Sequence, residues 1–459
     1  MKIRQVLIIL SIYLFPGKNT IAQKSDTDFL LEKIRKEYFK LGVESDSSKF
    51  EKYVSGILKD QEQDSLITLS NLTNYFRDQH LICYARRQDT LLQNIDHRFS
   101  IDQIKEKVKK HKYKYEGFWI NDLKTDVIGI VLVDVPKKIY HGYLVWSTDS
   151  SKIGNLVLRF NSLNKKNTSC EYINPYFRYR QFSPLYFNSK DEIQVWSYMK
   201  WERIKNGTTD ISSLIKPYSY TASLENKGRG IYVLKIPENS EDNIPVVDSL
   251  MKEFETCMDS AKVLIVDIRN NPGGTIRTYT AVLPFIYTNK ILRPDGINFV
   301  SEDLLNAEKR GLEQIDSVKY PSAFDKQRKR VDSLVNLVGK TVITKGRDKV
   351  FDTVYKNPIR VGLLINYACM SAAEAMILDF KQSKKVVIFG ENSAGAIDNL
   401  NAFALRLPSG NYSMWMPTFR TIPSATHRLY GGSGISPDVR ISKKISDWTQ
   451  YAANYFETH

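Results

Sequence analysis

The stretch VLIVDIRNNPGG, residues 263–274, decides the fold class of this chain. Its first six residues form a near-continuous apolar run, which is typical of a strand buried on both faces of a parallel sheet. A Gly-Gly turn follows, and a helical pattern begins at residue 275. Because glycine has no Cβ, the N–H groups of Gly273 and Gly274 can face inward at a helix start, where they suit an anion or a developing oxyanion. A tight turn without a ligand is the alternative interpretation.

A second strand-to-helix turn lies at residues 367–374, YACMSAAE. A strand predicted at 360–366 ends there, and a helix predicted at 371–382 begins at Ser371. Ser371 and Glu374 fit a capping box, in which the serine only caps the helix. The same position suits a nucleophile, because the helix dipole favours negative charge and the N–H of Ala372 could donate to an oxyanion.

Both turns belong to a region of alternating strands and helices, which predicts an α/β core over residues 228–459. Further core elements are expected as a strand at 230–236, a helix at 246–258, a strand at 386–389, and a turn with a last strand at 431–441. A charged, mostly helical insertion is predicted at about 301–338.

Two other modules precede this core. Apolar residues at helical spacing predict helices through 26–80, followed by a strand at 81–86, so residues 24–112 form an N-terminal helical segment. From 113 to 227 the period changes to two, with strands expected at 127–133, 141–146, 156–160 and 193–196. This pattern predicts a β-rich module, either a small barrel or a sandwich.

The composition excludes a disordered or low-complexity chain, since 42% of the 459 residues are hydrophobic and 25% are charged. The formal net charge is +15. The basic residues are spread among acids, and the densest runs, 105–114 and 326–330, fit solvated helix faces better than a site for a polyanion. We therefore expect no nucleic-acid partner.

The first residues resemble an export signal. Lys2 and Arg4 precede an apolar run at 6–15, Pro16 breaks the run, and a cleavage site is expected near Ala22 or Gln23. Residues 1–23 are therefore interpreted as a signal peptide, and the mature protein is expected in the periplasm or outside the cell. No later stretch reaches transmembrane length, so no stable membrane span is expected after signal removal.

The four cysteines, at positions 83, 170, 257 and 369, form no Cys-x-x-Cys pair, so no metal site is predicted. We interpret them as small buried hydrophobic residues. A single disulfide that involves Cys83 or Cys170 is left open.

Four segments in this order resemble the motifs of the C-terminal processing (tail-specific) serine peptidase family. They are 267–274, 371–374, 390–395 and 434–438. The resemblance implies an α/β protease core of ClpP/crotonase-like βα units, a polypeptide substrate, no metal or organic cofactor, and an endopeptidase that works through an acyl-enzyme. It also implies that Ser371 is the nucleophile, and that the N–H groups of Gly273 or Gly274 and of Ala372 form the oxyanion hole.

The chain departs from this family at the base. Many members place a Lys directly after the third motif, where this chain has Ala396, and Lys384 and Lys385 lie at the far end of the Ser371 helix. The chain is similar instead to the tricorn-core branch, in which an upstream His activates the Ser. This similarity implies that His80, in the sequence Asp78-Gln79-His80, is the base.

Other assignments at the site stay open. His80 could also be a structural histidine at a helix end, and His427 is the second candidate for the base. Gly431 stands where the tricorn-like branch has a Glu, so Asp398 and Glu374 are the candidates for an orienting acid. The remaining histidines lie in no recognised motif: His97, His111, His141 and His459.

The family often carries a PDZ domain, whose place here is taken by the β-rich module. One rival function is a catalytically inactive relative that binds a peptide or another ligand in the same cleft. Another is a surface- or polymer-binding protein that acts through the β-rich module and the basic charge. The sequence does not indicate an oligomeric state.

Overall fold

The computed structural model describes residues 25–43, 47–59, 65–86, 99–110, 112–162, 169–174, 179–197, 199–205, 210–425, 427–442 and 444–458. The predicted signal peptide lies outside these residues, as do His97, His111 and His459.

A six-stranded sheet forms the centre of the α/β region. The apolar run that opens the quoted segment is its strand β12, which pairs in parallel with a neighbour on each side. All the pairings of the sheet are parallel except the antiparallel pairing of β10 with β11. In spatial order the strands are β10 (Ser223–Gly228), β11 (Ile231–Lys235), β12 (Val263–Asp267), β15 (Arg360–Ile365), β16 (Val386–Gly390) and β21 (Val439–Arg440).

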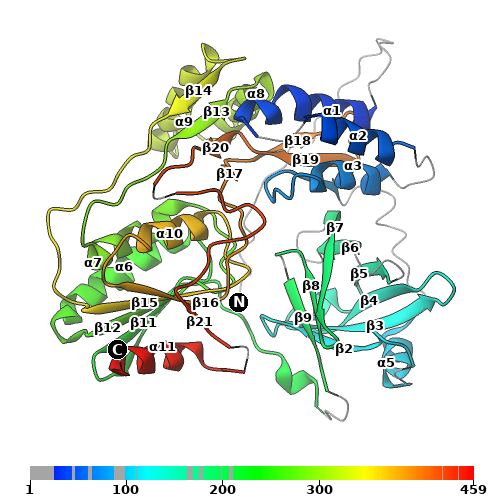
Figure 1. Ribbon diagram of the computed structural model, residues 1–459, viewed down its shortest axis with the longest axis horizontal. Helices are drawn as coiled ribbons and strands as arrows, with labels where there is room; N and C mark the ends of the chain where they lie inside the picture. The colour runs from blue at the N-terminus through cyan, green and yellow to red at the C-terminus, as the bar shows by residue number, and fades with distance from the viewer. Residues whose placement is uncertain are drawn as a thin grey trace.

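Helices cover both faces of this sheet (Figure 1). Leu264 and Val266 pack on one face, and Ile265 packs on the other, as expected for a strand that alternates sides. The helical pattern expected from residue 275 forms a 3₁₀ helix followed by one short α-helix. The first face carries α6 (Asn243–Cys257), η5 (Ile276–Val282), α7 (Leu283–Ile286) and α10 (Ala372–Phe380), and the second carries α11 (Trp448–Thr458), which the sequence did not predict.

The β-rich module is a closed antiparallel barrel. Each of its strands pairs with the next along the chain, and the last pairs with the first. Aromatic side chains such as Trp119, Phe160 and Trp201 fill its interior, and α5 (Ile101–Lys110) covers part of its outside. The strands are β2 (Gly117–Asn121), β3 (Asp126–Asp134), β4 (Ile139–Ser147), β5 (Leu156–Asn161), β6 (Ser169–Asn174), β7 (Tyr179–Ser189), β8 (Glu192–Val195) and β9 (Met199–Arg203).

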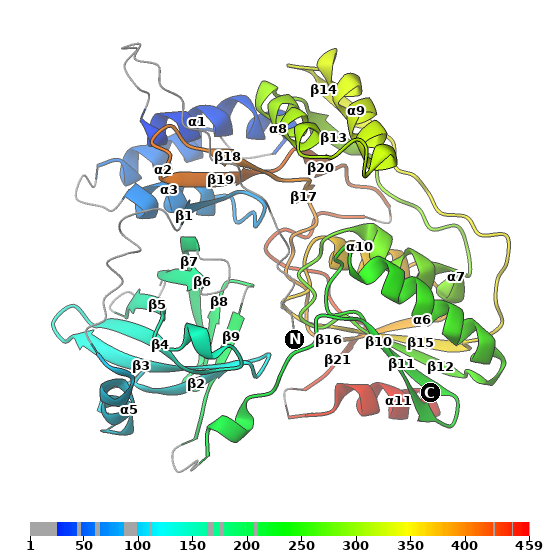
Figure 2. The same cartoon turned by 180° about the vertical axis from the view of Figure 1, so that it is seen from behind.

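The N-terminal helices pack on strands from both ends of the chain. β1 (Ile82–Arg86) pairs with β19 (Tyr412–Met416) on one side and with the barrel strand β7 on the other. β18 (Phe403–Arg406) extends the same sheet beyond β19. The helices that cover these strands are α1 (Asp26–Lys36), η1 (Tyr38–Leu41), α2 (Ser47–Ile57) and α3 (Ser65–Asn74), and Figures 1 and 2 show them above the barrel.

The charged insertion forms two helices, α8 (Glu302–Glu313) and α9 (Pro321–Val335). It accompanies a small antiparallel sheet of β14 (Thr341–Thr344), β13 (Gly296–Phe299), β20 (Phe419–Thr421) and β17 (Asn399–Leu400). No helix among the described residues is long and apolar enough to cross a membrane.

All four cysteines are free thiols. The disulfide that the sequence left open at Cys83 or Cys170 is therefore not formed. Both side chains are buried, in two different hydrophobic clusters.

Candidate functional site

Ser371 stands in a sharp turn between β15 and α10. Its backbone has φ +52° and ψ −116°, a region that residues with a Cβ rarely adopt. Holding such a conformation costs about 1–3 kcal/mol, and strained residues of this kind cluster at functional sites. The turn presents the Ser371 side chain at the end of the sheet, at the N-terminus of α10.

The two strand-to-helix turns are joined by asparagine side chains. The backbone N–H of Asn270 donates to Asn366 Oδ1 at 2.9 Å, and Asn366 Nδ2 donates back to Asn270 Oδ1 at 2.7 Å. The backbone N–H of Met370 donates to the carbonyl of Asn271 at 3.1 Å. These bonds hold the Gly-Gly turn against the residue before Ser371.

The glycine turn approaches Ser371 closely. A Cβ on Gly273, which has φ +91°, would stand 2.9 Å from Ser371 Cβ and 3.0 Å from the nitrogen of Ala372. The N–H of Gly273 donates to Asn271 Oδ1 at 2.9 Å, so it is already used. The N–H groups of Gly274 and Ala372 make no hydrogen bond with any described residue. The geometry therefore favours Gly274 over Gly273 as the donor that accompanies Ala372.

Asn271 is the side chain that orients this turn. It is fully buried, and besides accepting from Gly273 its Nδ2 donates to the carbonyl of Ile236 at 2.9 Å and to Asn239 Oδ1 at 3.2 Å. The sequence pattern does not single out Asn271 by itself, although it lies within residues 263–274. Its role depends on contacts with residues more than thirty positions away, which no local pattern indicates.

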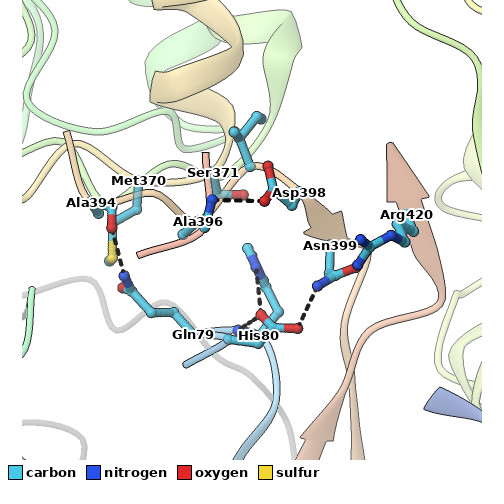
Figure 3. Close-up of polar contacts among 12 residues, drawn as sticks. Gln79, His80, Met370, Ser371, Ala394, Ala396, Asp398, Asn399 and Arg420 are labelled. Atoms are coloured by element: carbon cyan, nitrogen blue, oxygen red, sulfur yellow. Dashed lines mark hydrogen bonds and ion pairs between the residues drawn. The ribbon is translucent and has the colours of Figure 1, made fainter. Parts of the chain in front are cut away.

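His80 reaches the same site from the N-terminal segment, just before β1. Its Nδ1 lies 4.0 Å from Asp78 Oδ1 and has no hydrogen-bond partner among the described residues. Burial lowers the pKa of His80 below its ordinary value of 6.5, and the Asp78 carboxylate partly opposes this shift. In Figure 3 the His80 ring points from its loop toward the region of Ser371.

The Asp78 side chain holds the start of this loop. Asp78 was not among the acids that the sequence suggested for orienting the histidine. Its Oδ1 accepts the backbone N–H of His80 at 2.8 Å, while its Oδ2 accepts from Tyr38 at 3.0 Å and from Asn399 at 2.9 Å. Burial raises the pKa of Asp78. The signal that could have found it was the Asp78-Gln79-His80 sequence, but only the fold directs the carboxylate toward the ring.

Glu374, one of the two expected acids, lies buried beneath the turn that holds Ser371. It is fully buried and accepts hydrogen bonds from the N–H groups of Ser371, Gly395 and Ala396 and from the hydroxyl of Ser393. Burial raises the pKa of Glu374 to about 7. No hydrogen bond or ion pair joins it to His80 within the described residues, so this carboxylate organises the loop at 393–396.

Asp398, the other expected acid, also turns away from the histidine. Its carboxylate accepts the backbone N–H groups of Tyr430 at 2.8 Å and Gly431 at 2.7 Å. It makes no hydrogen bond or ion pair with His80 in the described part of the chain. Of the three nearby carboxylates, only that of Asp78 faces the His80 ring.

The alternative bases lie elsewhere. His427 does not line the pocket that holds Ser371, and burial together with the nearby Arg293 cation lowers the pKa of His427 to about 4. Lys385 donates to the carbonyl of Tyr355, at the far end of α10. Ala396 stands buried at the position where many family members have the Lys.

One pocket of about 420 Å³ collects the site residues. His80, Ser371, Ala372 and Gly274 all line it, with Gln79 and Asn401 as the other polar members. The rest of its lining is apolar: Ile82, Ile276, Ala375, Ile397, Leu400, Ala402 and Trp415.

A metal site is not evident in this part of the chain. Among the described residues, no group of three His, Cys, Asp or Glu side chains is placed to hold an ion.

Comparison with protein families identifies the α/β region. Residues 230–441 match the model of Peptidase family S41. This part of the chain, a little under half of its length, therefore matches a family of serine-type peptidases of the C-terminal processing kind. The region that matches this family is combined here with an all-β barrel. Among curated proteins, no sequence matches the chain.

Solved structures show distant likeness. Mature CPAF is 13% identical, with 94% of this chain and 95% of that chain covered and a TM-score of 0.45. The photosystem II D1 C-terminal processing protease is 12% identical, with 92% and 95% covered and a TM-score of 0.41. A lipoprotein from Streptococcus agalactiae is 16% identical, with 52% and 70% covered and a TM-score of 0.32.

The hydrogen bonds of Asn271 lead to a prediction about the turn at Gly273 and Gly274. Replacing Asn271 with Ala frees the N–H of Gly273 and removes the bonds that join the turn to Ile236 and Asn239, in the segment that follows β11. Since misplacing a reacting group can cost about 10²-fold, we expect kcat on an unstructured protein substrate to fall by up to about that factor, with KM little changed.

The control for this variant is Asn298→Ala, which removes an exposed asparagine bond to Thr344 in the small sheet. Thermal unfolding of both variants separates lost positioning from lost folding. Wild-type kcat in a folded Asn271→Ala protein would show that the turn needs no such support.

Proposed function

We propose that this protein is an exported serine endopeptidase with Ser371 as nucleophile and His80 as general base. The observation that carries the proposal is that His80, Ser371, Ala372 and Gly274 line one pocket although they come from three separate segments. A nucleophile, a base and two N–H donors are the parts that acyl transfer requires.

The proposed reaction proceeds through an acyl-enzyme. His80 Nε2 accepts the Ser371 Oγ proton as Oγ bonds to the scissile carbonyl carbon, and the negative oxygen binds the N–H groups of Gly274 and Ala372. When the tetrahedral species collapses, the C–N bond breaks and the imidazolium gives its proton to the leaving amine. A water molecule, deprotonated in turn by His80, then releases the acyl group and restores Ser371.

We further propose Asp78 as the residue that orients His80, in place of the Asp398 and Glu374 expected from the sequence. Nδ1 is the ring nitrogen that faces Asp78, which leaves Nε2 for Ser371. The Asp78 carboxylate also stabilises the imidazolium that forms during attack. Ser371 and His80 are not hydrogen-bonded to each other among the described residues, and catalytic hydrogen bonds in ligand-free enzymes often tighten only with substrate.

We also propose that the protein resembles the tricorn-core branch and that its core has the ClpP/crotonase-like arrangement. The absence of the Lys at Ala396 and the position of His80 support the tricorn-core branch. The parallel β11-β12-β15-β16 order, with α6 and α10 packed on one face, supports the ClpP/crotonase-like description.

A fluorophosphonate probe tests the proposed function directly, because it labels only an activated serine. We expect wild-type protein to be labelled at Ser371 and to cleave an unstructured protein, and Ser371→Ala to do neither. Mass spectrometry of the labelled peptide identifies the site. A folded wild-type protein that resists the probe would instead favour the catalytically inactive, ligand-binding relative.

The pH dependence of activity tests the roles of His80 and Asp78. Because burial lowers the pKa of His80, its neutral form persists to lower pH, so kcat/KM should fall only at an acid inflection below 6.5. The negative Asp78 raises the pKa of His80, so Asp78→Asn should move that inflection to still lower pH and reduce kcat. His80→Ala should lose activity as severely as Ser371→Ala, since the pair acts as a unit.

Asp398→Asn is the matched control for this profile, because its carboxylate binds only backbone N–H groups away from the ring. We expect its acid inflection to coincide with that of the wild type. If Asp398→Asn moves the inflection and Asp78→Asn does not, the orienting role belongs to Asp398.

Export is proposed from the first 23 residues, with the periplasm or the exterior of the cell as the destination. N-terminal sequencing of protein recovered from those compartments should begin near Gln23 or Lys24. Recovery of an intact Met1 end from the cytoplasm would contradict this proposal.

A further inference from the structure

The barrel touches the candidate site directly. The connection from β8 to β9 carries Ser197, whose side chain is buried, with 4% of the residue exposed. Ser197 Oγ donates to Gln79 Oε1 and lies 3.4 Å from Met370 Sδ. Gln79 precedes His80 in the chain and Met370 precedes Ser371, so one barrel hydroxyl contacts both neighbours of the proposed catalytic pair.

Gln79 completes a chain of bonds across the site. While its Oε1 accepts from Ser197, its Nε2 donates to the carbonyl of Ala394 at 3.1 Å, as Figure 3 shows for the second bond. Ala394 belongs to the loop that Glu374 organises behind Ser371. The Gln79 amide therefore links the loop of His80, the loop behind Ser371 and the barrel.

A second contact anchors the barrel on the nucleophile side. The hydroxyl of Tyr367, at the end of the strand that leads to Ser371, donates to Asp122 Oδ2 and accepts the backbone N–H of Lys200 at 2.8 Å. Lys200 Nζ lies 3.8 Å from the Tyr367 ring centroid and binds Glu391 Oε2 at 2.8 Å. Asp122 and Lys200 are barrel residues, whereas Tyr367 and Glu391 belong to the peptidase domain.

These contacts matter because the proposed base, His80, does not belong to the peptidase domain. His80 arrives on a separate segment, and its Nδ1 has no hydrogen-bond partner among the described residues. The position of the ring therefore depends on how firmly its loop is held. Side chains that hold a reacting group without touching the substrate act by pre-organisation, and small displacements there reduce kcat more than KM.

We propose that the barrel is a positioning element of the active site, in which Ser197, through Gln79, holds the His80 loop against the Ser371 loop. This inference rests on the proposed function of His80 and Ser371. Ser197 is a positioning residue, because it contacts the neighbours of the pair and does not line the pocket. The barrel thus contributes to the chemistry whether or not it also binds substrate.

The test begins with Ser197→Ala in the full-length protein. We expect kcat to fall by about 10- to 10²-fold, the range in which small misplacements act, with KM within about twofold and fluorophosphonate labelling of Ser371 slowed in proportion. Ser197→Thr keeps the hydroxyl and should recover most of the loss. Unchanged kcat and labelling rate in Ser197→Ala would overturn the inference.

Ser183→Ala is the matched control. Ser183 is another buried barrel serine, 1% exposed, and its Oγ accepts from Gln181 Nε2 at 2.7 Å within the same strand. We expect it to leave kcat unchanged. An equal loss of kcat in Ser183→Ala would show that the barrel acts only through general stability, and would overturn the role of Ser197.

Gln79→Met removes the same series of hydrogen bonds at the Gln79 end. The methionine side chain has a similar length but can form neither the bond to Ser197 nor the bond to Ala394. If the two residues act through one contact, Gln79→Met should lose kcat to a similar extent and the double variant should lose little more. Fully additive losses would contradict the proposed series of hydrogen bonds, and this variant keeps the test decisive if Ser197→Ala fails to fold.

Wild-type protein that is neither labelled nor active would count against the proposed function, whereas labelled wild type with unaffected variants counts against the barrel alone.

Discussion

Four residue pairs, from Ile82 with Trp415 to Ala85 with Tyr412, join β1 to β19, and the site depends on this ladder. His80 lies directly before β1, and Trp415 of β19 lines the pocket that holds Ser371. Because side chains alternate across a strand, a slip of one residue would invert every side chain of β1 relative to its neighbours. The N-terminal helices bury both strands in one hydrophobic cluster, which fixes the register and with it the position of the histidine.

The other half of the site is built by two turns that support each other. Ser371 adopts a positive φ that costs about 1–3 kcal/mol. The bonds between Asn270 and Asn366, and from Met370 to Asn271, each contribute about 0.5–1.5 kcal/mol. Together they are large enough to offset the strain. Only glycine fits opposite Ser371, since a Cβ on Gly273 would lie under 3 Å from its side chain.

The barrel follows a different principle, because closure leaves its own eight strands almost no free edge. Among the described barrel strands, only β7 extends beyond the barrel, to pair with β1. The barrel is thereby joined to the sheet that carries the histidine, and its Ser197 and Lys200 contact the segment that carries the serine. The β-rich module is therefore built into the same framework as the site.

The sequence by itself determined the elements whose cause is local. The apolar run of β12, the glycine turn, the strand-to-helix turn at Ser371 and the change of period in the β-rich module are all properties of neighbouring residues, and they predicted an α/β peptidase with an added β module. Strands without clear alternation, such as β6, β7 and β9, were not predicted, and neither was α11.

Only the tertiary structure decided what depends on distant contacts. It distinguished a barrel from a sandwich, because closure requires β9 to pair with β2. It turned the Asp78 carboxylate toward the His80 ring and those of Glu374 and Asp398 toward backbone N–H groups. It also engaged the N–H of Gly273 with Asn271 and left that of Gly274, a residue of the pocket lining, without a hydrogen bond among the described residues. A carboxylate or an N–H has the same sequence signature whichever partner it finds, so its direction is set by the packing of segments that the chain brings together from as far as 383 positions apart.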